Sequence, residues 1–325
     1  MKHKLYPLTF HPIYKEKIWG GRRLQDLFGR ALPEGLIGES WDVAAHVHGT
    51  SVVDHGPLAG KNLVQLALDY GEELLGKGVQ AYQGKFPLLL KLIDANQDLS
   101  VQVHPHDAYV RDHTNEMWGK TELWYIVHSE PGAWIVWGLR PGTTKEEFAQ
   151  AIKAGGDAIL ACLNKVPVQA GEVYPISAGL VHALGAGCLV AEIQQNSDTT
   201  YRVYDWDRLD ETGQARELHV KQALEVIDFS PLALDRDYQF SRCGEYFELE
   251  VLEETQGVDL DVQDGFQILT NVKGNAEVIY QGNATKIVPG QSCLLPAALQ
   301  TCQLYAEGVV LKSSPSKAGV TVTRL

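Results

Sequence analysis

The sequence predicts a mainly β protein made of two β barrels, with a few helices inserted between strands. Short runs rich in Val, Ile, Leu and Tyr alternate with Gly, Pro, Asn and Asp turns along most of the chain. Helical periodicity is confined to a few stretches. A faint internal repeat is also present, because residues 171–179 and 290–298 share the same rhythm of Gly, apolar residues and Pro. Two related barrels would produce such a repeat.

The expected strands are short apolar or alternating runs bounded by turn residues. In chain order they cover residues 52–53, 99–104, 123–127, 133–137, 173–176, 189–194 and 200–204.

Three helices are expected between these strands. Residues 61–75 carry apolar side chains on one helical stripe. Thr144-Lys-Glu-Glu147 is a capping box, and the helix that it begins should end before Gly155. A third helix is expected over residues 219–227.

The repeat predicts a domain boundary near residue 235. Residues 1–235 should form a larger catalytic domain with helical insertions, and residues 236–325 a smaller β domain. In the second copy Thr301 stands at the position that matches His182, and no histidine follows His219. The C-terminal domain is therefore predicted to have no metal site.

Composition excludes several classes of protein. The net charge of −13 argues against a nucleic-acid partner, which a basic surface would meet. No apolar run approaches the roughly 20 residues that span a membrane, and the first residues lack the apolar core of a signal peptide. The five cysteines form no Cys-x-x-Cys motif. We expect them to be buried hydrophobic residues in a cytoplasmic protein.

Four side chains have the types and spacing of metal ligands. Gln102 and His104 are two residues apart on an alternating run and so point to one face of a strand. Glu122 begins a second strand-like run, and His182 ends a third after a Pro-x-x-x-Gly turn. Two imidazoles, a carboxylate and an amide carbonyl are typical of a catalytic divalent metal site. Imidazole favours zinc, one ion per chain, although Mn, Fe, Co or Ni accept the same ligands.

Other histidines compete for this role. His106 and Asp107 follow Pro105, which should turn the chain out of the strand, so both are expected outside the barrel. His46, His48 and His55 form a second cluster for which no matching carboxylate is evident. Metal binding there is the weaker alternative.

A polar run follows over residues 187–208. Glu192 and Gln194 share one strand face, and Arg202 shares a face with Thr200 and Tyr204. The interleaved Tyr and Trp suit a pocket wall as much as a solvated sheet. On one straight strand Arg202 and Arg208 would be about 20 Å apart. Both can reach one ligand only if the chain bends near residues 205–207.

Together these motifs resemble the type I mannose-6-phosphate isomerase family in its short bacterial form. The matching stretches lie between residues 19 and 208, in the family's order: 19–21, 38–42, 86–91, 99–105, 119–125, 179–183 and 192–205. The resemblance implies a cupin (jelly-roll) catalytic domain with a zinc ion and a second, smaller cupin-like domain.

Carried over by position, the resemblance assigns roles to individual residues. The zinc ligands would be Gln102, His104, Glu122 and His182. The catalytic residues would be Arg202, Lys120 and Glu192, and the substrate phosphate would contact Ser100 and Arg208. Apart from the resemblance, Lys91 is a further candidate for the phosphate contact. Two departures concern substrate contacts: the family's His-Pro-Asp is here His104-Pro-His-Asp107, and Leu184 stands where some relatives have tyrosine.

The expected function is the interconversion of mannose 6-phosphate and fructose 6-phosphate through a cis-enediol. Zinc would act as the Lewis acid, Arg202 would stabilise the oxyanion, and Glu192 or Lys120 would be the base. The alternatives are a cupin acting on another sugar phosphate, an iron oxygenase, and a non-catalytic sugar-phosphate-binding cupin. The partner should be a small-molecule sugar phosphate, and the protein a monomer or weak homo-oligomer.

Overall fold

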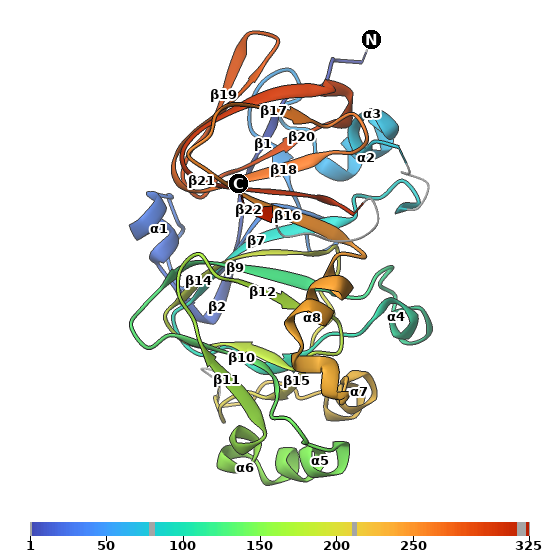
Figure 1. Ribbon diagram of the computed structural model, residues 1–325, viewed down its shortest axis with the longest axis vertical. Helices are drawn as coiled ribbons and strands as arrows, with labels where there is room; N and C mark the ends of the chain where they lie inside the picture. Colours follow the sequence, from blue (N-terminus) through green and yellow to red (C-terminus); the bar gives the residue numbers. More distant parts are fainter. Residues whose placement is uncertain (1, 78–81, 210–212, 317–322, 325) are drawn as a thin grey trace.

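The structure is a computed structural model that describes residues 2–77, 82–209, 213–316 and 323–324 of the 325-residue chain. It confirms the mainly β fold with inserted helices. Two strand-rich parts lie one above the other along the long axis, and the helices α5 and α6 close the lower end (Figure 1).

The lower part is built from two sheets. The six-stranded sheet has the order β12-β9-β14-β7-β3-β2, and the five-stranded sheet has the order β11-β10-β13-β8-β15. The strands of the first are β2 (Ile13–Gly21), β3 (Ile37–Val43), β7 (Leu88–Ala95), β9 (Glu122–Ser129), β12 (Val173–Ile176) and β14 (Cys188–Gln195). Those of the second are β8 (Val101–Val103), β10 (Trp134–Leu139), β11 (Leu163–Pro167), β13 (His182–Leu184) and β15 (Tyr201–Tyr204).

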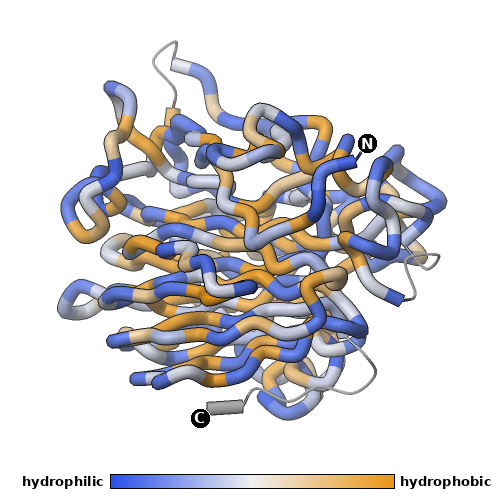
Figure 2. Tube along the Cα trace, turned by 90° about the horizontal axis from the view of Figure 1, so that it is seen from above, coloured by the Kyte–Doolittle hydropathy of each residue, from blue (hydrophilic) through white to orange (hydrophobic). Residues whose placement is uncertain are grey.

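One hydrophobic cluster joins these two sheets. Trp124 and Ile126 of β9 pack in it with Ile135 and Trp137 of β10. Since each strand sends alternate side chains to opposite faces, the barrel interior receives one side of each strand. Figure 2 shows apolar and polar positions alternating along many of the strands.

The upper part is a nine-stranded sheet. Its main order is β22-β16-β21-β18-β20-β1-β6, with β17 beside β21 and β19 beside β18. The bounds are β1 (Leu8–His11), β6 (Val52–Val53), β16 (Phe247–Glu253), β17 (Gln256–Asp261), β18 (Gln267–Tyr280), β19 (Asn283–Ile287), β20 (Ser292–Leu295), β21 (Thr301–Pro315) and β22 (Thr323–Arg324). A short ribbon of β4 (Ala45–His46) and β5 (Gly49–Thr50) is separate.

Strands from the beginning of the chain complete the upper sheet. β1 pairs with β20, with Leu8 opposite Leu294, and then with β6. The C-terminal part therefore shares its sheet with residues from the predicted N-terminal domain. The boundary near residue 235 stays a prediction.

The helices lie at the edges of the barrels. Their bounds are α1 (Arg23–Phe28), α2 (Leu63–Tyr70), α3 (Glu72–Leu75), α4 (Asp107–His113), α5 (Lys145–Ala154), α6 (Gly156–Ala161), α7 (Val220–Val226) and α8 (Arg236–Cys243), with short 3₁₀ turns η2 (Pro231–Leu234) and η3 (Ala297–Leu299). The predicted capping box at α5 is confirmed, because Thr144 and Glu147 each accept a hydrogen bond from the other's backbone N–H.

The helix predicted over residues 61–75 is instead two helices. The chain breaks at Gly71, whose φ of 49° and ψ of −117° do not continue a helix. Glycine adopts this conformation readily because it has no Cβ. The apolar stripe is nevertheless buried, as Leu63, Leu66 and Leu74 are almost fully enclosed.

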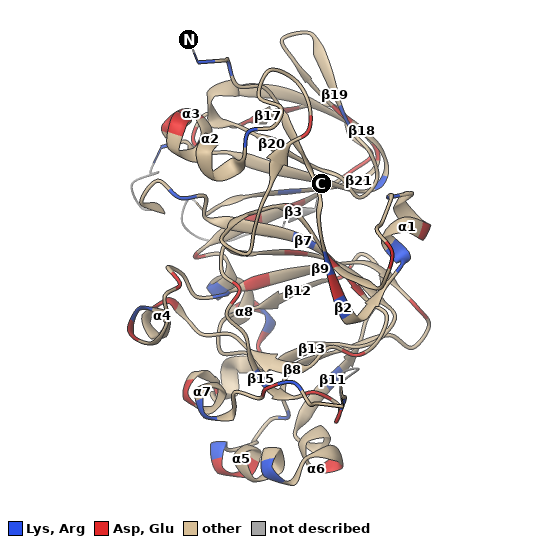
Figure 3. Ribbon diagram, turned by 180° about the vertical axis from the view of Figure 1, so that it is seen from behind, with Lys and Arg blue, Asp and Glu red and all other residues tan. Residues whose placement is uncertain are grey.

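The surface carries acidic and basic residues intermixed over the helices and strands in the view of Figure 3. No helix in the part of the chain that the structure describes has the length and apolar character to cross a bilayer. Four of the five cysteines are buried as predicted, whereas Cys162 is only partly buried.

Candidate metal centre and active site

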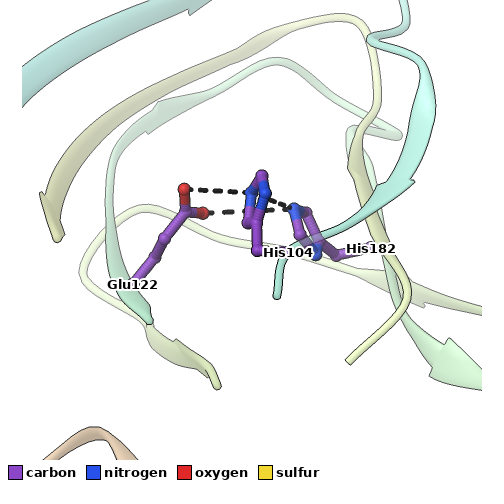
Figure 4. A group of neighbouring side chains, drawn as sticks. All are labelled: His104, Glu122 and His182. Carbon is purple, nitrogen blue, oxygen red and sulfur yellow. Dashed lines mark hydrogen bonds and ion pairs between the residues drawn. The ribbon is translucent and has the colours of Figure 1, made fainter. Parts of the chain in front are cut away.

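Three predicted ligands from distant segments meet inside the lower barrel. His104 directly follows β8, Glu122 begins β9 and His182 begins β13. Strand pairing sets His182 opposite Gln102, while Glu122 reaches the same place from the other sheet. The three side chains point toward one another (Figure 4), and each is at most 1% exposed.

The atoms that meet are suited to hold a cation. Nε2 of His104 lies 3.1 Å from Nε2 of His182 and 3.2 Å from Oε1 of Glu122. Oε2 of Glu122 lies 4.0 Å from Nε2 of His182. A group of His, Cys, Asp or Glu ligand atoms this tight occurs only here among the described residues.

The tautomers of both imidazoles follow from their backbone contacts. Nδ1 of His104 lies 3.0 Å from the carbonyl oxygen of Thr199, and Nδ1 of His182 lies 2.9 Å from that of Leu180. A carbonyl only accepts, so each Nδ1 carries the hydrogen and each Nε2 presents a lone pair. Two lone pairs and a carboxylate oxygen therefore converge, an arrangement that a divalent cation stabilises.

The carboxylate of Glu122 also lacks hydrogen-bond partners among the described residues. Lys120 Nζ forms an ion pair with Oε1 at 2.9 Å, yet neither carboxylate oxygen accepts a hydrogen bond from any residue that the structure describes. A buried carboxylate without such partners is costly unless a cation satisfies it. The residues thus fit a metal ion.

The protonation states also suit metal binding. Burial and the charge of Lys120 lower the pKa of His104 to about 3, and burial lowers the pKa of His182. Burial opposes ionisation of Glu122, but Lys120 and His104 hold the pKa of its carboxyl well below the usual range. Neutral imidazoles and an ionised carboxylate are the forms that bind a metal.

Gln102 lies beside this group as predicted. Its Nε2 is 3.3 Å from Nε2 of His182, and its Oε1 accepts a hydrogen bond from Ser100. Rotating the amide by half a turn brings the carbonyl oxygen to the metal side, and the two orientations have nearly the same shape.

We call His104, Glu122 and His182 the metal group. A cavity of about 310 Å³ opens beside it. Six predicted site residues line it: Lys91, Ser100, Gln102, Lys120, Glu192 and Arg202. A polar pocket next to a candidate metal site is suited to a small polar ligand.

Comparisons with known proteins agree on one family. The family description "Phosphomannose isomerase type I, catalytic domain" matches residues 8–117, and "Mannose-6-phosphate isomerase, cupin domain" matches residues 237–315. Mannose-6-phosphate isomerase ManA of Bacillus subtilis strain 168 is 39% identical over 316 residues, which cover 94% of this chain and 98% of ManA. This chain belongs to the type I mannose-6-phosphate isomerase family.

Two further relatives support this family assignment. Mannose-6-phosphate isomerase of Streptococcus mutans is 44% identical over 221 residues, covering 68% of this chain and 67% of the relative. A crystal structure of mannose 6-phosphate isomerase from Bacillus subtilis superimposes with a TM-score of 0.82 at 31% identity, covering 94% of this chain and 99% of that one. The resemblance and the cupin fold predicted from the sequence are confirmed.

In this family member, Glu192 lies in a buried network of charges. Its Oε1 is 3.3 Å from Lys91 Nζ, and its Oε2 accepts a hydrogen bond from the Trp124 indole at 2.9 Å. Burial and the nearby Glu122 carboxylate raise the pKa of Glu192 to about 7. Burial opposes the charge of Lys91, yet Glu192 and Glu39 raise the pKa of that lysine.

Arg202 occupies the cavity wall on β15, opposite Gln102 of β8. Its Nε is buried and has no hydrogen-bond partner among the described residues. Burial and the charge of Arg216 lower the pKa of Arg202. A guanidinium with an unused donor at the metal group can bind a negatively charged oxygen.

Arg208 lies outside the set of residues that line the cavity. The chain does bend near residues 205–207, where Trp206 and Asp207 have φ of 57° and 53°. This bend turns Arg208 toward the backbone, where Nη1 donates to the Asp98 carbonyl and Nη2 pairs with Asp205. The phosphate contact assigned to Arg208 stays a prediction.

Some cavity residues were not among the predicted site residues. Asp198 lies in the polar run 187–208; burial opposes its ionisation, but Lys91 and Lys120 lower the pKa of its carboxyl to about 2. Arg216 and His219 also line the cavity, though they lie outside every matched motif. No local signal distinguishes Arg216 from a surface arginine, because its position depends on Asp205.

The rival ligands lie outside the metal group. His106 is exposed and caps α4 by accepting a hydrogen bond from the N–H of Tyr109. Asp107 accepts from the N–H of Gly119 and from the side chain of Gln195.

The histidines of the second cluster, His46, His48 and His55, each contact a different carboxylate. His46 pairs with Glu116 at 3.1 Å, and His48 with Asp198 at 3.1 Å, so carboxylates that the sequence did not reveal are near. His55 contacts Asp54 instead. His46 and His48 line a separate, larger groove of about 940 Å³.

Proposed function

We propose that this enzyme interconverts mannose 6-phosphate and fructose 6-phosphate by a 1,2 proton shift through a cis-enediol, with one zinc ion per chain. The observation that carries the proposal is the buried convergence of His104, Glu122 and His182 beside a cavity that also holds Arg202. Two imidazoles, a carboxylate and an amide favour zinc. Family membership supports the substrate.

Gln102, His104, Glu122 and His182 would hold the ion. When bound there, the ion would supply a Lewis acid that stabilises negative charge developing on the sugar. Arg202 donates hydrogen bonds to the oxygen that becomes negative as the proton leaves the adjacent carbon. Arginine stays charged at every working pH and cannot itself take the proton.

Glu192 is our candidate for the base. Its raised pKa lies near neutrality, and its Oε1 has no hydrogen-bond partner among the described residues, although Lys91 is close. Lys120 is held by Glu122 at 2.9 Å. A base works best when its pKa is near the working pH. Lys120 then serves to stabilise negative charge beside the metal group, and Lys91 and Ser100 line the wall that receives the substrate.

The decisive assay follows conversion of mannose 6-phosphate to fructose 6-phosphate in a coupled reaction. We expect turnover by the zinc-loaded protein. A zinc-loaded protein that binds the sugar phosphate without converting it would instead identify the non-catalytic cupin. Oxygen uptake by an iron-loaded protein would identify the oxygenase.

Glu192 also gives the activity a pH dependence. The carboxylate form is the active base, so kcat/KM should rise with pH as Glu192 loses its proton. Its pKa is raised from 4.5 to about 7 by burial first and Glu122 second. A cation on Glu122 offsets the second cause, so the acid limb should have its midpoint between these two values.

The variant Glu192→Gln should lower kcat about 10²- to 10⁴-fold and lose this acid limb. Its matched control is Glu146→Gln on the exposed face of α5. A pH profile of Glu192→Gln that keeps the wild-type acid limb would assign the base to another group.

A further inference from the structure

We propose that Arg216 binds the phosphate group of the substrate, held in position by Asp205. This inference rests on the proposed function, since it concerns the phosphorylated end of the same substrate. The family resemblance assigned that contact to Arg208 and Ser100, with Lys91 as a further candidate, and Arg216 was in none of the matched motifs.

The first argument is the distribution of charge around the cavity. Every lysine of the cavity wall has a carboxylate partner within 3.3 Å: Lys17 with Glu39, Lys91 with Glu192 and Lys120 with Glu122. Asp198 adds a further carboxylate there. The lysines and their carboxylate partners therefore offer no surplus positive charge to a dianion.

The wall formed by β15 and the residues that follow it is different. Arg202, Arg208 and Arg216 gather around one buried carboxylate, Asp205, which pairs directly with Arg208 and Arg216. Glu217 is also close, but its side chain is 84% exposed and therefore screened by water. Positive charge exceeds negative charge along this wall, as binding of a phosphate dianion requires.

The second argument separates Arg216 from Arg208. Arg208 uses Nη1 on the Asp98 carbonyl, Nε on the Asp205 carbonyl and Nη2 on the Asp205 carboxylate. Arg216 uses only Nε and Nη2, which donate to the two oxygens of Asp205 at 2.7 and 2.5 Å. No described residue accepts a bond from its Nη1, and Arg216 lines the cavity whereas Arg208 does not.

This paired contact fixes the plane of the guanidinium. Asp205 binds the edge of the Arg216 guanidinium that carries Nε and Nη2. The remaining N–H donors therefore keep a fixed direction, and binding a ligand costs little further side-chain entropy. Asp205 is suited to the task because it stays ionised: burial opposes its charge, but Arg216 and Arg208 lower the pKa of its carboxyl. Arg208 thus acts on the site by holding Asp205.

The third argument is the position of Ser100. β15 runs antiparallel to β8, with Arg202 opposite Gln102 and Tyr204 opposite Val101. Asp205 and Ser100 therefore lie at the same end of this strand pair. Ser100 lines the cavity as well. A phosphate at this end can meet the Ser100 hydroxyl and the free donors of Arg216, while the sugar carbons extend toward the metal group.

The test compares Arg216→Ala, Arg208→Ala and the control Arg111→Ala, an exposed arginine of α4. Two quantities are measured: KM and kcat for mannose 6-phosphate, and the affinity for inorganic phosphate by calorimetry. We expect Arg216→Ala to lower the affinity for phosphate and to raise KM for mannose 6-phosphate, each about 10- to 100-fold. This is the range of a lost charge-assisted contact. We expect a smaller effect in Arg208→Ala and none in Arg111→Ala.

The outcomes separate this inference from the proposed function. A wild type that converts no mannose 6-phosphate but binds phosphate through Arg216 refutes the function and keeps the site. Equal phosphate affinity in Arg216→Ala and Arg111→Ala overturns the assignment even in an active enzyme, as does a larger loss in Arg208→Ala than in Arg216→Ala. If Arg216→Ala does not fold, Arg216→Lys replaces it, and wild-type phosphate affinity in that variant counts against the two-point hold on Asp205.

Discussion

Stripping the metal with a chelator is expected to lower isomerase activity at least about 10³-fold, because Lewis-acid stabilisation of the developing oxyanion is worth several kcal/mol. The loss should be recovered by adding zinc to the stripped protein. Metal content by mass spectrometry and turnover in the coupled assay, measured on the same samples, test this expectation. Full activity in metal-free protein would refute the metal's role.

The variant His104→Ala should reproduce the loss by removing one of the converging Nε2 atoms. Its matched control is Thr301→Ala, at the position of the internal repeat that corresponds to His182. Thr301 begins β21 and is exposed, and the tight ligand group among the described residues lies in the lower barrel. A Thr301→Ala protein that lost its zinc would contradict the prediction of a C-terminal domain without a metal site.

The metal group could be predicted because its local part follows from strand geometry. Alternation over residues 99–104 put Gln102 and His104 on one face, and the Pro after His104 favoured a position outside the barrel for His106. His182 joins them only through the pairing of β13 with β8. Sequence spacing does not give such a register. His182 was therefore a candidate only from its residue type and its place after a turn, and the motifs of the family strengthened that choice.

The proposed phosphate contact was harder to predict because it depends on a bend. The need for a turn at residues 205–207 was visible, but its direction was not. Trp206 and Asp207 take positive φ, a conformation that is uncommon for residues other than glycine. The Trp206 indole donates to the Leu99 carbonyl and fixes the turn. This tertiary contact sends Arg208 toward Asp98 and leaves the cavity wall to Arg216.

The pairing of β1 with β20 could not be predicted from the sequence either. It joins residues nearly at opposite ends of the chain, Leu8 with Leu294. Neither segment carries a local mark of its partner, because apolar strands of this kind fit several neighbours. A boundary inferred from an internal repeat contains no information about strands that cross between the repeats.

Arg202→Ala is expected to lower kcat about 10²- to 10³-fold, the cost of removing one donor to a developing oxyanion. Zinc content should stay at the wild-type level, since Arg202 contributes no ligand to the metal group. Arg202→Lys should recover only part of the rate, because an ammonium cannot reproduce the planar fork. Steady-state kinetics and metal analysis of the three proteins separate a catalytic role from a structural one.

The lowered pKa of Arg202 also predicts how its removal affects the stability of the fold. Burial and the charge of Arg216 lower that pKa, so the folded protein disfavours the positive charge of Arg202 relative to the unfolded chain. Truncation relieves this cost, so Arg202→Ala should melt at a temperature equal to or above that of the wild type. A large loss of kcat together with unimpaired stability is the pattern of a residue retained for catalysis. Near-normal kcat, or a rate loss that follows a loss of zinc, would assign Arg202 a different role.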